Sequence, residues 1–259
     1  MTKIISLFNQ SGGVGKTTLT MNLGYHLAQA GRKILLVDID PQASLTTFMG
    51  LKPFELSKTI RNSLLDEESL AIHRELHNMD LVPSNIFLSQ SEMQLAGEYM
   101  RERKLLDALE PHRDSYDCIL IDCPPSLGLL SVMSLMAATH LLIPIQTEYK
   151  SVEGTMLLLK TISDLVKKVN RTLFVVGAIP TMYDDRTVQG KNALRTIKEI
   201  FAQLKVHPNF KNSQVFPAIP RRTDFANASA AHLPLALYAP EHNALKTLQQ
   251  ITLEVDGLK

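Results

Sequence analysis

The chain has 259 residues, of which 45% are hydrophobic and 20% are charged, and its formal net charge is +1. This length and composition can supply the core of one large folded domain. The charge balance gives no overall field for an anionic partner, so any preference for nucleic acid or membrane must come from a local patch.

Two cysteines, Cys118 and Cys123, are too few for a disulfide framework and suggest a reducing compartment. The chain enters a predicted strand within three residues, which leaves no room for a signal peptide. We find no apolar run of the length needed to cross a bilayer. We therefore expect a soluble, cytoplasmic protein.

The first segment with recognisable chemistry is residues 6–18, SLFNQSGGVGKTT. An apolar run leads into a glycine-rich turn and then a helical pattern, which is the order of a phosphate-binding loop. Three glycines let the backbone amides point inward: Gly12, Gly13 and Gly15. Lys16 would reach the terminal phosphates, and the Thr17 hydroxyl would bind Mg²⁺. Gln10 stands where the strict G-x-x-x-x-G-K-S/T pattern has its first glycine.

The rest of the chain alternates between strand-like apolar runs and helical patterns. Further strands are predicted at residues 33–37, 79–82, 118–121, 140–145, 172–179 and 216–219. Helices are predicted at residues 19–30, 89–109, 127–138, 152–169, 188–204 and 243–255. Continuous rather than alternating apolarity indicates strands covered on both faces. The sequence therefore predicts one α/β domain over residues 1–259, with a doubly wound, mostly parallel sheet flanked by helices.

Aspartates follow two of the predicted strands, at the sheet edge where ligands bind in such folds. Asp122 has the position of a carboxylate that holds Mg²⁺, although a helix N-cap role is the alternative. Asp38 and Asp40 would face opposite sides if their strand continued. One aspartate could then face the water that attacks the γ-phosphate while the other contacts Mg²⁺ or the loop. The alternative is that one of the two only caps a helix.

Four motifs, in the order GGVGKTT, VDIDPQAS, IDCPPSLGLL and QTEYKSVEG, resemble those of the ParA/MinD family of deviant Walker ATPases. The resemblance covers essentially the whole chain and implies a switch that binds ATP and Mg²⁺, dimerises with ATP and hydrolyses it. The resemblance implies that Asp40 orients the attacking water with the help of Asp38. It also implies that Thr17, Asp40 and Asp122 bind Mg²⁺. The implied nucleotide contacts are Ser11, Gly12, Gly13, Val14, Gly15, Lys16, Thr17, Thr18, Met182 and Asp184.

One departure from the family pattern concerns its signature lysine, whose position is occupied by Ser11. Lys150 stands where the family usually has an aromatic residue, in a segment that the resemblance places near the dimer interface. We hypothesise that Lys150 supplies the missing charge across the dimer; a solvated surface lysine is the alternative. Loss of the signature lysine also resembles the McdA branch, which positions carboxysomes.

A basic stripe lies between residues 186 and 222, where eight lysines and arginines are opposed only by Glu199, for a net charge of +7. Such a stripe is typical of binding to the phosphate backbone without sequence readout, although most charge runs are solvated faces. The family resemblance favours DNA. The candidate DNA contacts are Arg186, Lys191, Arg195, Lys198, Arg221 and Arg222.

The sequence thus favours an ATPase, stimulated by DNA or a ParB-like or McdB-like adaptor, that positions or partitions a carboxysome, plasmid or chromosome over the nucleoid. Its expected partners are a second subunit and nonspecific double-stranded DNA, without a membrane. The alternatives are a MinD-like membrane switch, a metabolic ligase of the same fold and an ATP-binding scaffold with little turnover. The tail, residues 243–259, has nearly balanced charges, and its helix is predicted to be a core helix rather than a membrane-binding one.

Overall fold

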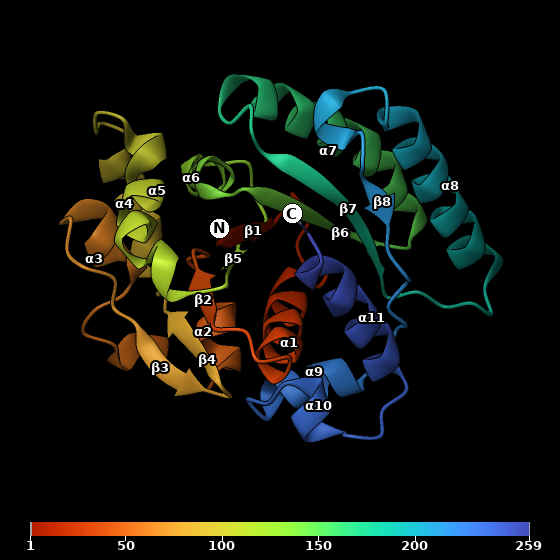
Figure 1. Ribbon diagram of the computed structural model, residues 1–259, viewed down its shortest axis with the longest axis horizontal. Helices are drawn as coiled ribbons and strands as arrows, with labels where there is room; N and C mark the ends of the chain where they lie inside the picture. Colours follow the sequence, from red (N-terminus) through yellow and green to blue (C-terminus); the bar gives the residue numbers. More distant parts are fainter. Residues whose placement is uncertain (1, 259) are drawn as a thin grey trace.

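The computed structural model describes residues 2–258, except for the side chains at 149–153 and at 167. Within this range the chain forms an eight-stranded sheet in the order β3-β4-β2-β5-β1-β6-β7-β8 (Figure 1). All neighbouring strands are parallel except the β3–β4 pair. The strands are β1 (Lys3–Leu7), β2 (Ile34–Asp38), β3 (His73–Leu76), β4 (Met79–Val82), β5 (Cys118–Asp122), β6 (His140–Gln146), β7 (Phe174–Thr181) and β8 (Gln214–Val215).

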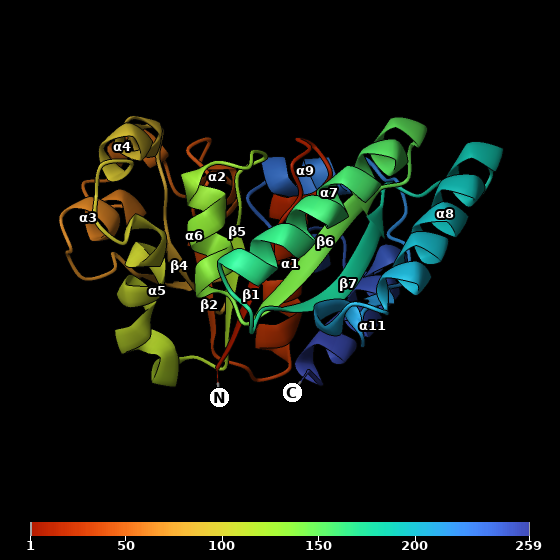
Figure 2. The same cartoon turned by 90° about the horizontal axis from the view of Figure 1, so that it is seen from above.

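Helices cover both faces of the sheet (Figures 1 and 2). One face is packed by α1 (Lys16–Gln29), α2 (Ser44–Phe48), α9 (Asp224–Ala230), α10 (Leu235–Tyr238) and α11 (Ala244–Asp256). The other is packed by α3 (Ile60–Leu65), α4 (Phe87–Leu95), α5 (Lys104–Leu109), α6 (Leu129–Ala137), α7 (Tyr149–Lys168) and α8 (Val188–Leu204). The predicted doubly wound, mostly parallel α/β fold is confirmed.

The continuous apolar runs of the strands are explained by this double covering. Ile4 and Leu35 contribute to the core on one face, and their neighbours Ile5 and Leu36 contribute to the core on the other. All four side chains are fully buried. A strand with only one covered face would place every second residue in water, and its sequence would alternate.

The predicted long helix at 89–109 is wrong, because the structure divides this segment into α4 and α5 with a short 3₁₀ turn (Arg101–Arg103) between them. Met100 takes a left-handed backbone conformation with φ of 50°, which a continuous α-helix does not allow. The chain then turns back, and the Lys104 ammonium lies 3.5 Å from carboxylate oxygens of both Glu67 and Glu98.

The predicted strand at 216–219 is also wrong, and the last strand is β8 at Gln214–Val215. The chain still follows β7 beyond β8, since the amide of Ile219 donates to the carbonyl of Pro180 at 2.8 Å. Pro217 and Pro220 have no N–H to donate, so the ladder cannot continue regularly. The weakly patterned residues 44–78 contain α2, α3 and the antiparallel edge strand β3, none of which the pattern predicted.

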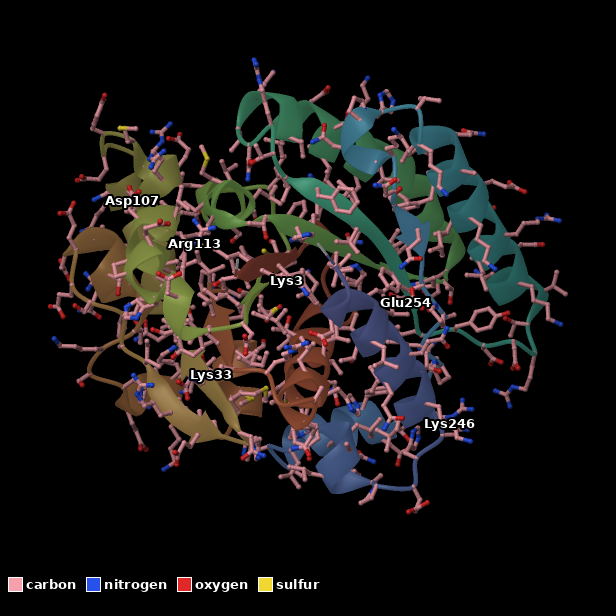
Figure 3. The ribbon with its side chains drawn as sticks, in the orientation of Figure 1. Lys3, Lys33, Asp107, Arg113, Lys246 and Glu254 are labelled. Atoms are coloured by element: carbon pink, nitrogen blue, oxygen red, sulfur yellow. The ribbon has the colours of Figure 1, made fainter. Side chains whose placement is uncertain are left out.

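The last helix, α11, is a core helix as predicted. Leu248, Ile251 and Val255 are buried in the core that includes α1. Lys246 is exposed at the surface of α11, and Glu254 on the same helix accepts a hydrogen bond from Gln214 at 2.7 Å (Figure 3). Among the described residues, no helix combines the length and apolarity that a membrane crossing requires.

Gly177 in β7 gives a direct test of the sheet geometry. Its φ is 152°, and a Cβ atom built there would lie 1.9 Å from the carbonyl oxygen of Gln214 in β8. We expect Gly177→Ala to lower the free energy of unfolding by about 2 kcal/mol or more, because backbone must move to relieve the contact. Urea unfolding measures this.

The matched control is Gly154→Ala in α7, where an added Cβ meets nothing within 4 Å. That substitution should stabilise the protein by about 1 kcal/mol, because alanine favours a helix more than glycine does. Equal effects of the two substitutions would contradict the description of the β7–β8 contact.

Candidate functional site

The glycine-rich loop connects β1, in the middle of the sheet, to the first turn of α1. Gly13 and Gly15 have φ of 71° and 92°, a region that residues with a Cβ rarely occupy. Gly15 is the N-cap of α1, whose first backbone N–H groups have no acceptor within the helix. Ser11, Gly12 and Gly13 are exposed, whereas Val14 is buried. The loop therefore presents backbone donors to a ligand at the carboxyl edge of the sheet.

Hydrogen bonds to two other strands, β6 and β7, hold this loop in place. The side-chain nitrogen of Asn9, Nδ2, donates to the carbonyl of Pro144 in β6 at 2.6 Å. The side-chain oxygen, Oδ1, accepts from the backbone N–H of Ser11 at 2.9 Å. The hydroxyl of Thr181, at the end of β7, donates to the carbonyl of Val14 at 2.9 Å. Sequence reasoning missed Asn9 and Thr181. The available signal was a polar residue at the end of an apolar strand.

Lys16 is buried beneath the loop. Its ammonium donates to the carbonyl oxygens of Asn9 at 3.0 Å and of Ser11 at 2.9 Å. Burial lowers the pKa of Lys16, and the charges of Asp122 and Asp40 oppose that shift. The lysine is thus a buried ammonium held against the glycine loop, and an ammonium is a suitable donor for a polyphosphate.

Asp122, the last residue of β5, has a carboxylate that suits a divalent cation. Its Oδ2 accepts a hydrogen bond from the Thr17 hydroxyl at 2.7 Å, and its buried Oδ1 has no hydrogen-bond partner. Burial raises the pKa of Asp122 well above the usual range, with a further contribution from the charge of Asp38. A buried oxygen without a donor fits a metal ion, directly or through water.

No group of three or more His, Cys, Asp or Glu side chains in the described part of the chain could hold a metal by itself. Mg²⁺ at nucleotide sites takes only one or two protein ligands and completes its shell with phosphate and water. Thr17 and Asp122 therefore fit nucleotide-dependent Mg²⁺ binding.

Asp38 is the last residue of β2, and both of its carboxylate oxygens are occupied. Oδ1 accepts from the backbone N–H of Asp40 at 3.1 Å, and Oδ2 accepts from the backbone N–H and the hydroxyl of Thr46 at 2.8 and 2.7 Å. Asp40 Oδ1 accepts from the backbone N–H of Gln42 at 2.9 Å. Because β2 ends at Asp38, the two acids do not alternate across the sheet, and both lie close enough to raise the pKa of Asp122.

A cleft of about 250 Å³ opens beside the start of α1. Gly15 and Thr18 line it from one side and Met182 from another. Met182 follows β7 with a φ of 52°, so the chain turns sharply at this wall. The remaining residues that line the cleft are Leu19, Thr181, Ile219, Arg221, Arg222, Thr223 and Phe225.

Asp184 does not line the cleft. It forms a bidentate ion pair with Arg186, with both nitrogen–oxygen distances at 2.9 Å. The hydrogen bonds from Arg186 lower the pKa of Asp184 to about 2. The pair thus fixes the turn before α8.

The six candidate DNA contacts fall into separate places. Lys191, Arg195 and Lys198 are exposed on α8, which runs along the outside of the molecule (Figures 1 and 2). Arg221 lies 3.3 Å from the Glu148 carboxylate, and both Arg221 and Arg222 line the cleft. Arg186 is held by Asp184, as described above. The side chain of Lys150 lies outside the described residues, and its backbone is in the first turn of α7.

The buried carboxylates should make the stability of the nucleotide-free protein depend on pH. Burial raises the pKa of Asp38 to about 7, so between pH about 4 and 7 the folded chain holds a proton that the unfolded chain has lost. Stability should therefore fall as pH rises through this window, by up to about 1.4 kcal/mol per pH unit from this group.

Urea unfolding at several pH values, with a chelator present, measures this dependence. Asp38→Asn should reduce the slope because it removes the titrating group. An identical slope in the variant would contradict the assignment.

Comparison with known proteins agrees with this geometry. A family model described as "AAA domain" matches residues 2–175. The sporulation initiation inhibitor protein Soj of Bacillus subtilis is 36% identical over 98% of both chains.

Two solved structures resemble the whole chain. One is a cobyrinic acid a,c-diamide synthase from Mycobacterium smegmatis with bound ADP and magnesium, 32% identical with a TM-score of 0.81 over 97% of this chain and 93% of that one. The other is a Cyanothece McdA(D38A)–ATP complex, 26% identical with a TM-score of 0.85 over 100% of this chain and 97% of that one. This chain belongs to the ParA/MinD/Soj family of P-loop ATPases.

Proposed function

We propose that this protein is an ATP-driven switch that pairs with a second copy when ATP is bound, binds double-stranded DNA without sequence preference in that state, and is released by hydrolysis. The observation that carries the proposal is the buried Lys16 beneath the glycine loop, whose ammonium donates to the carbonyls of Asn9 and Ser11. Relatives named as chromosome-partitioning proteins support the reading, among them ParA of Myxococcus xanthus.

Different residues of the site would bind different parts of the nucleotide. The backbone N–H groups of residues 11–18 and the Lys16 ammonium would hold the phosphates, for which Lys16 would exchange its bonds to the carbonyls of Asn9 and Ser11. The cleft at Thr18 and Met182 would take the base. Asp184 is outside that cleft, so its part is to fix the following turn through Arg186.

Thr17, Asp122 and Asp40 would hold Mg²⁺, which when bound neutralises charge on the phosphates. Asp40 is the better candidate to orient the attacking water, with Asp38 assisting, because both oxygens of Asp38 already accept hydrogen bonds from Asp40 and Thr46. The rate of hydrolysis and its stimulation by DNA or an adaptor belong to the same proposal.

Ser11 stands in the position of the family's signature lysine, so the positive charge of that lysine is missing there. We assign this charge to Lys150 of the opposing subunit. Lys150→Ala should lower the rate of hydrolysis by about 10²-fold or more and weaken ATP-dependent dimerisation, because it removes a cation from the developing phosphate charge. The measurements are ATP turnover and sedimentation with ATP.

The control for this experiment is Lys160→Ala, an exposed lysine of the same helix. Wild-type turnover and dimerisation in the Lys150 variant would end this assignment.

The DNA contacts are tested by anisotropy of a random-sequence duplex with ATP, with ADP and without nucleotide, at two salt concentrations. We expect binding only with ATP and a steep loss with salt, because binding to phosphates releases counterions. Replacing Lys191, Arg195 and Lys198 by Ala should weaken binding and reduce the salt slope by about 1 per lost phosphate contact. Lys246→Ala on α11 is the surface control.

Absence of DNA binding in every nucleotide state would contradict the switch. It would favour the ATP-dependent ligase alternative, which the likeness to the cobyrinic acid a,c-diamide synthase supports. Binding that ignores the nucleotide would remove the coupling from the proposal. ATP binding with negligible turnover would indicate a scaffold.

The proposed cargo depends on which relatives within the family this protein resembles in function. The whole-chain likeness to the Cyanothece McdA structure supports a carboxysome cargo with an McdB-like adaptor. The likeness to the chromosome partitioning protein ParA supports a chromosome with a ParB-like adaptor. In either case the protein would be cytoplasmic and associated with the nucleoid, with the adaptor stimulating hydrolysis.

A further inference from the structure

The hydroxyl of Thr46 links three parts of the chain behind the candidate site. Thr46 lies in α2 and is fully buried. Its Oγ1 donates to Asp38 Oδ2 at 2.7 Å and accepts from the backbone N–H of Ser84, after β4, at 2.9 Å. A backbone N–H can only donate, so the hydroxyl must accept that bond. The only proton of the hydroxyl therefore points to Asp38.

This relay fixes the orientation of the Asp38 side chain. Oδ2 receives two donors from Thr46, and the opposite oxygen, Oδ1, receives the backbone N–H of Asp40 at 3.1 Å. A rotation of the carboxylate would break bonds on both sides at once. The position of the Asp40 backbone thus depends on an Asp38 orientation that Thr46 sets.

Thr46 has no part in the ligand-binding surfaces described above. It is not among the residues that line the cleft, and the single proton of its hydroxyl is donated to Asp38. Removing the hydroxyl would leave the N–H of Ser84 buried without an acceptor and would take one of three donors from Asp38. Its effect on a reaction would be transmitted through the two aspartates.

We propose that Thr46 is a positioning residue for ATP hydrolysis: through Asp38 it holds the segment that carries Asp40 at the place where Asp40 orients the attacking water. The inference rests on the proposed ATPase function. It assigns Thr46 to the hydrolytic step and not to nucleotide binding, because its hydroxyl acts only through Asp38.

The test compares Thr46→Val, which keeps the shape and removes the hydroxyl, with Thr46→Ser, which keeps the hydroxyl. We expect the Val variant to lose about 10- to 100-fold in kcat, as is usual when a supporting hydrogen bond is removed, and the Ser variant to restore most of it. Affinity for ADP and for a nonhydrolysable ATP analogue should stay within about twofold of wild type in both.

The matched control is Thr47→Val in the same helix turn. The Thr47 hydroxyl donates to the carbonyl of Ala43 at 3.0 Å and makes no described contact with Asp38. This variant should turn over ATP like the wild type. An equal loss of kcat in the Thr47 variant would show that disturbing α2 is sufficient and would overturn the specific role of Thr46.

A second readout needs no turnover. In the nucleotide-free protein, hydrogen exchange of the Asp40 amide reports its bond to Asp38 Oδ1. Exchange should be faster in Thr46→Val than in the wild type and unchanged in Thr46→Ser and Thr47→Val. Should Thr46→Val not fold, Thr46→Ala, which leaves space for water at the N–H of Ser84, takes its place in both measurements.

The variant Asp38→Asn distinguishes a failure of the proposed function from a failure of the inference about Thr46. If this variant hydrolyses ATP at the wild-type rate, the proposed role of Asp38 is wrong and Thr46 loses its route to the reaction. If Asp38→Asn is slow while Thr46→Val has wild-type kcat and wild-type exchange at Asp40, the proposed function stands and the inference about Thr46 is overturned.

Discussion

The structure depends on buried like charges at one edge of the sheet. The parallel register pairs Asp38 of β2 with Asp122 of β5, so these two carboxylates lie side by side on adjacent strands. Both are fully buried, and Lys16 is the nearby buried cation. Burial raises the pKa of each acid, because a charged carboxylate is poorly solvated there. A divalent cation with a polyphosphate would relieve this repulsion and supply a further anion for Lys16, so the two ligands would favour each other's binding here.

The cost of this charge cluster is offset by hydrogen bonds from the backbone. Asp38 accepts two backbone N–H groups, and the carbonyls of Asn9 and Ser11 accept from the Lys16 ammonium. These partners come from the loop itself, from the turn after β2 and from α2, so backbone groups fix the positions of both Lys16 and Asp38. Preorganised donors do not have to reorganise during a reaction, and this is the main electrostatic advantage that a protein site has over water.

The sequence predicts which groups meet at this edge of the sheet better than it predicts the contacts that support them. The glycine loop and the three aspartates could be found because each directly follows an apolar strand, and a parallel sheet brings such ends together. The partners of Asn9 and Thr46 could not be predicted, because these side chains contact Pro144 and Ser84, far away in the chain. Position in the chain and the family resemblance place Arg221 and Arg222 with the basic stripe, and the fold adds that both line the cleft. The break at Met100 needed a backbone conformation that helical periodicity does not encode.

The cleft and the basic helix are joined by one short, braced segment. Met182 lines the cleft, the Asp184–Arg186 ion pair follows, and Thr187 caps α8 by accepting from the N–H of Gly190 at 3.0 Å. A Cβ added at Gly190 would lie 2.6 Å from the carbonyl oxygen of Asp184, so the turn packs tightly on the first turn of the helix. A braced segment transmits a displacement at one end to the other, whereas a flexible one absorbs it. Coupling between two ligands requires that each favour the same one of two arrangements. If a nucleotide occupies the cleft and a polyanion binds α8, as proposed, both ligands would act on the segment from Met182 to α8.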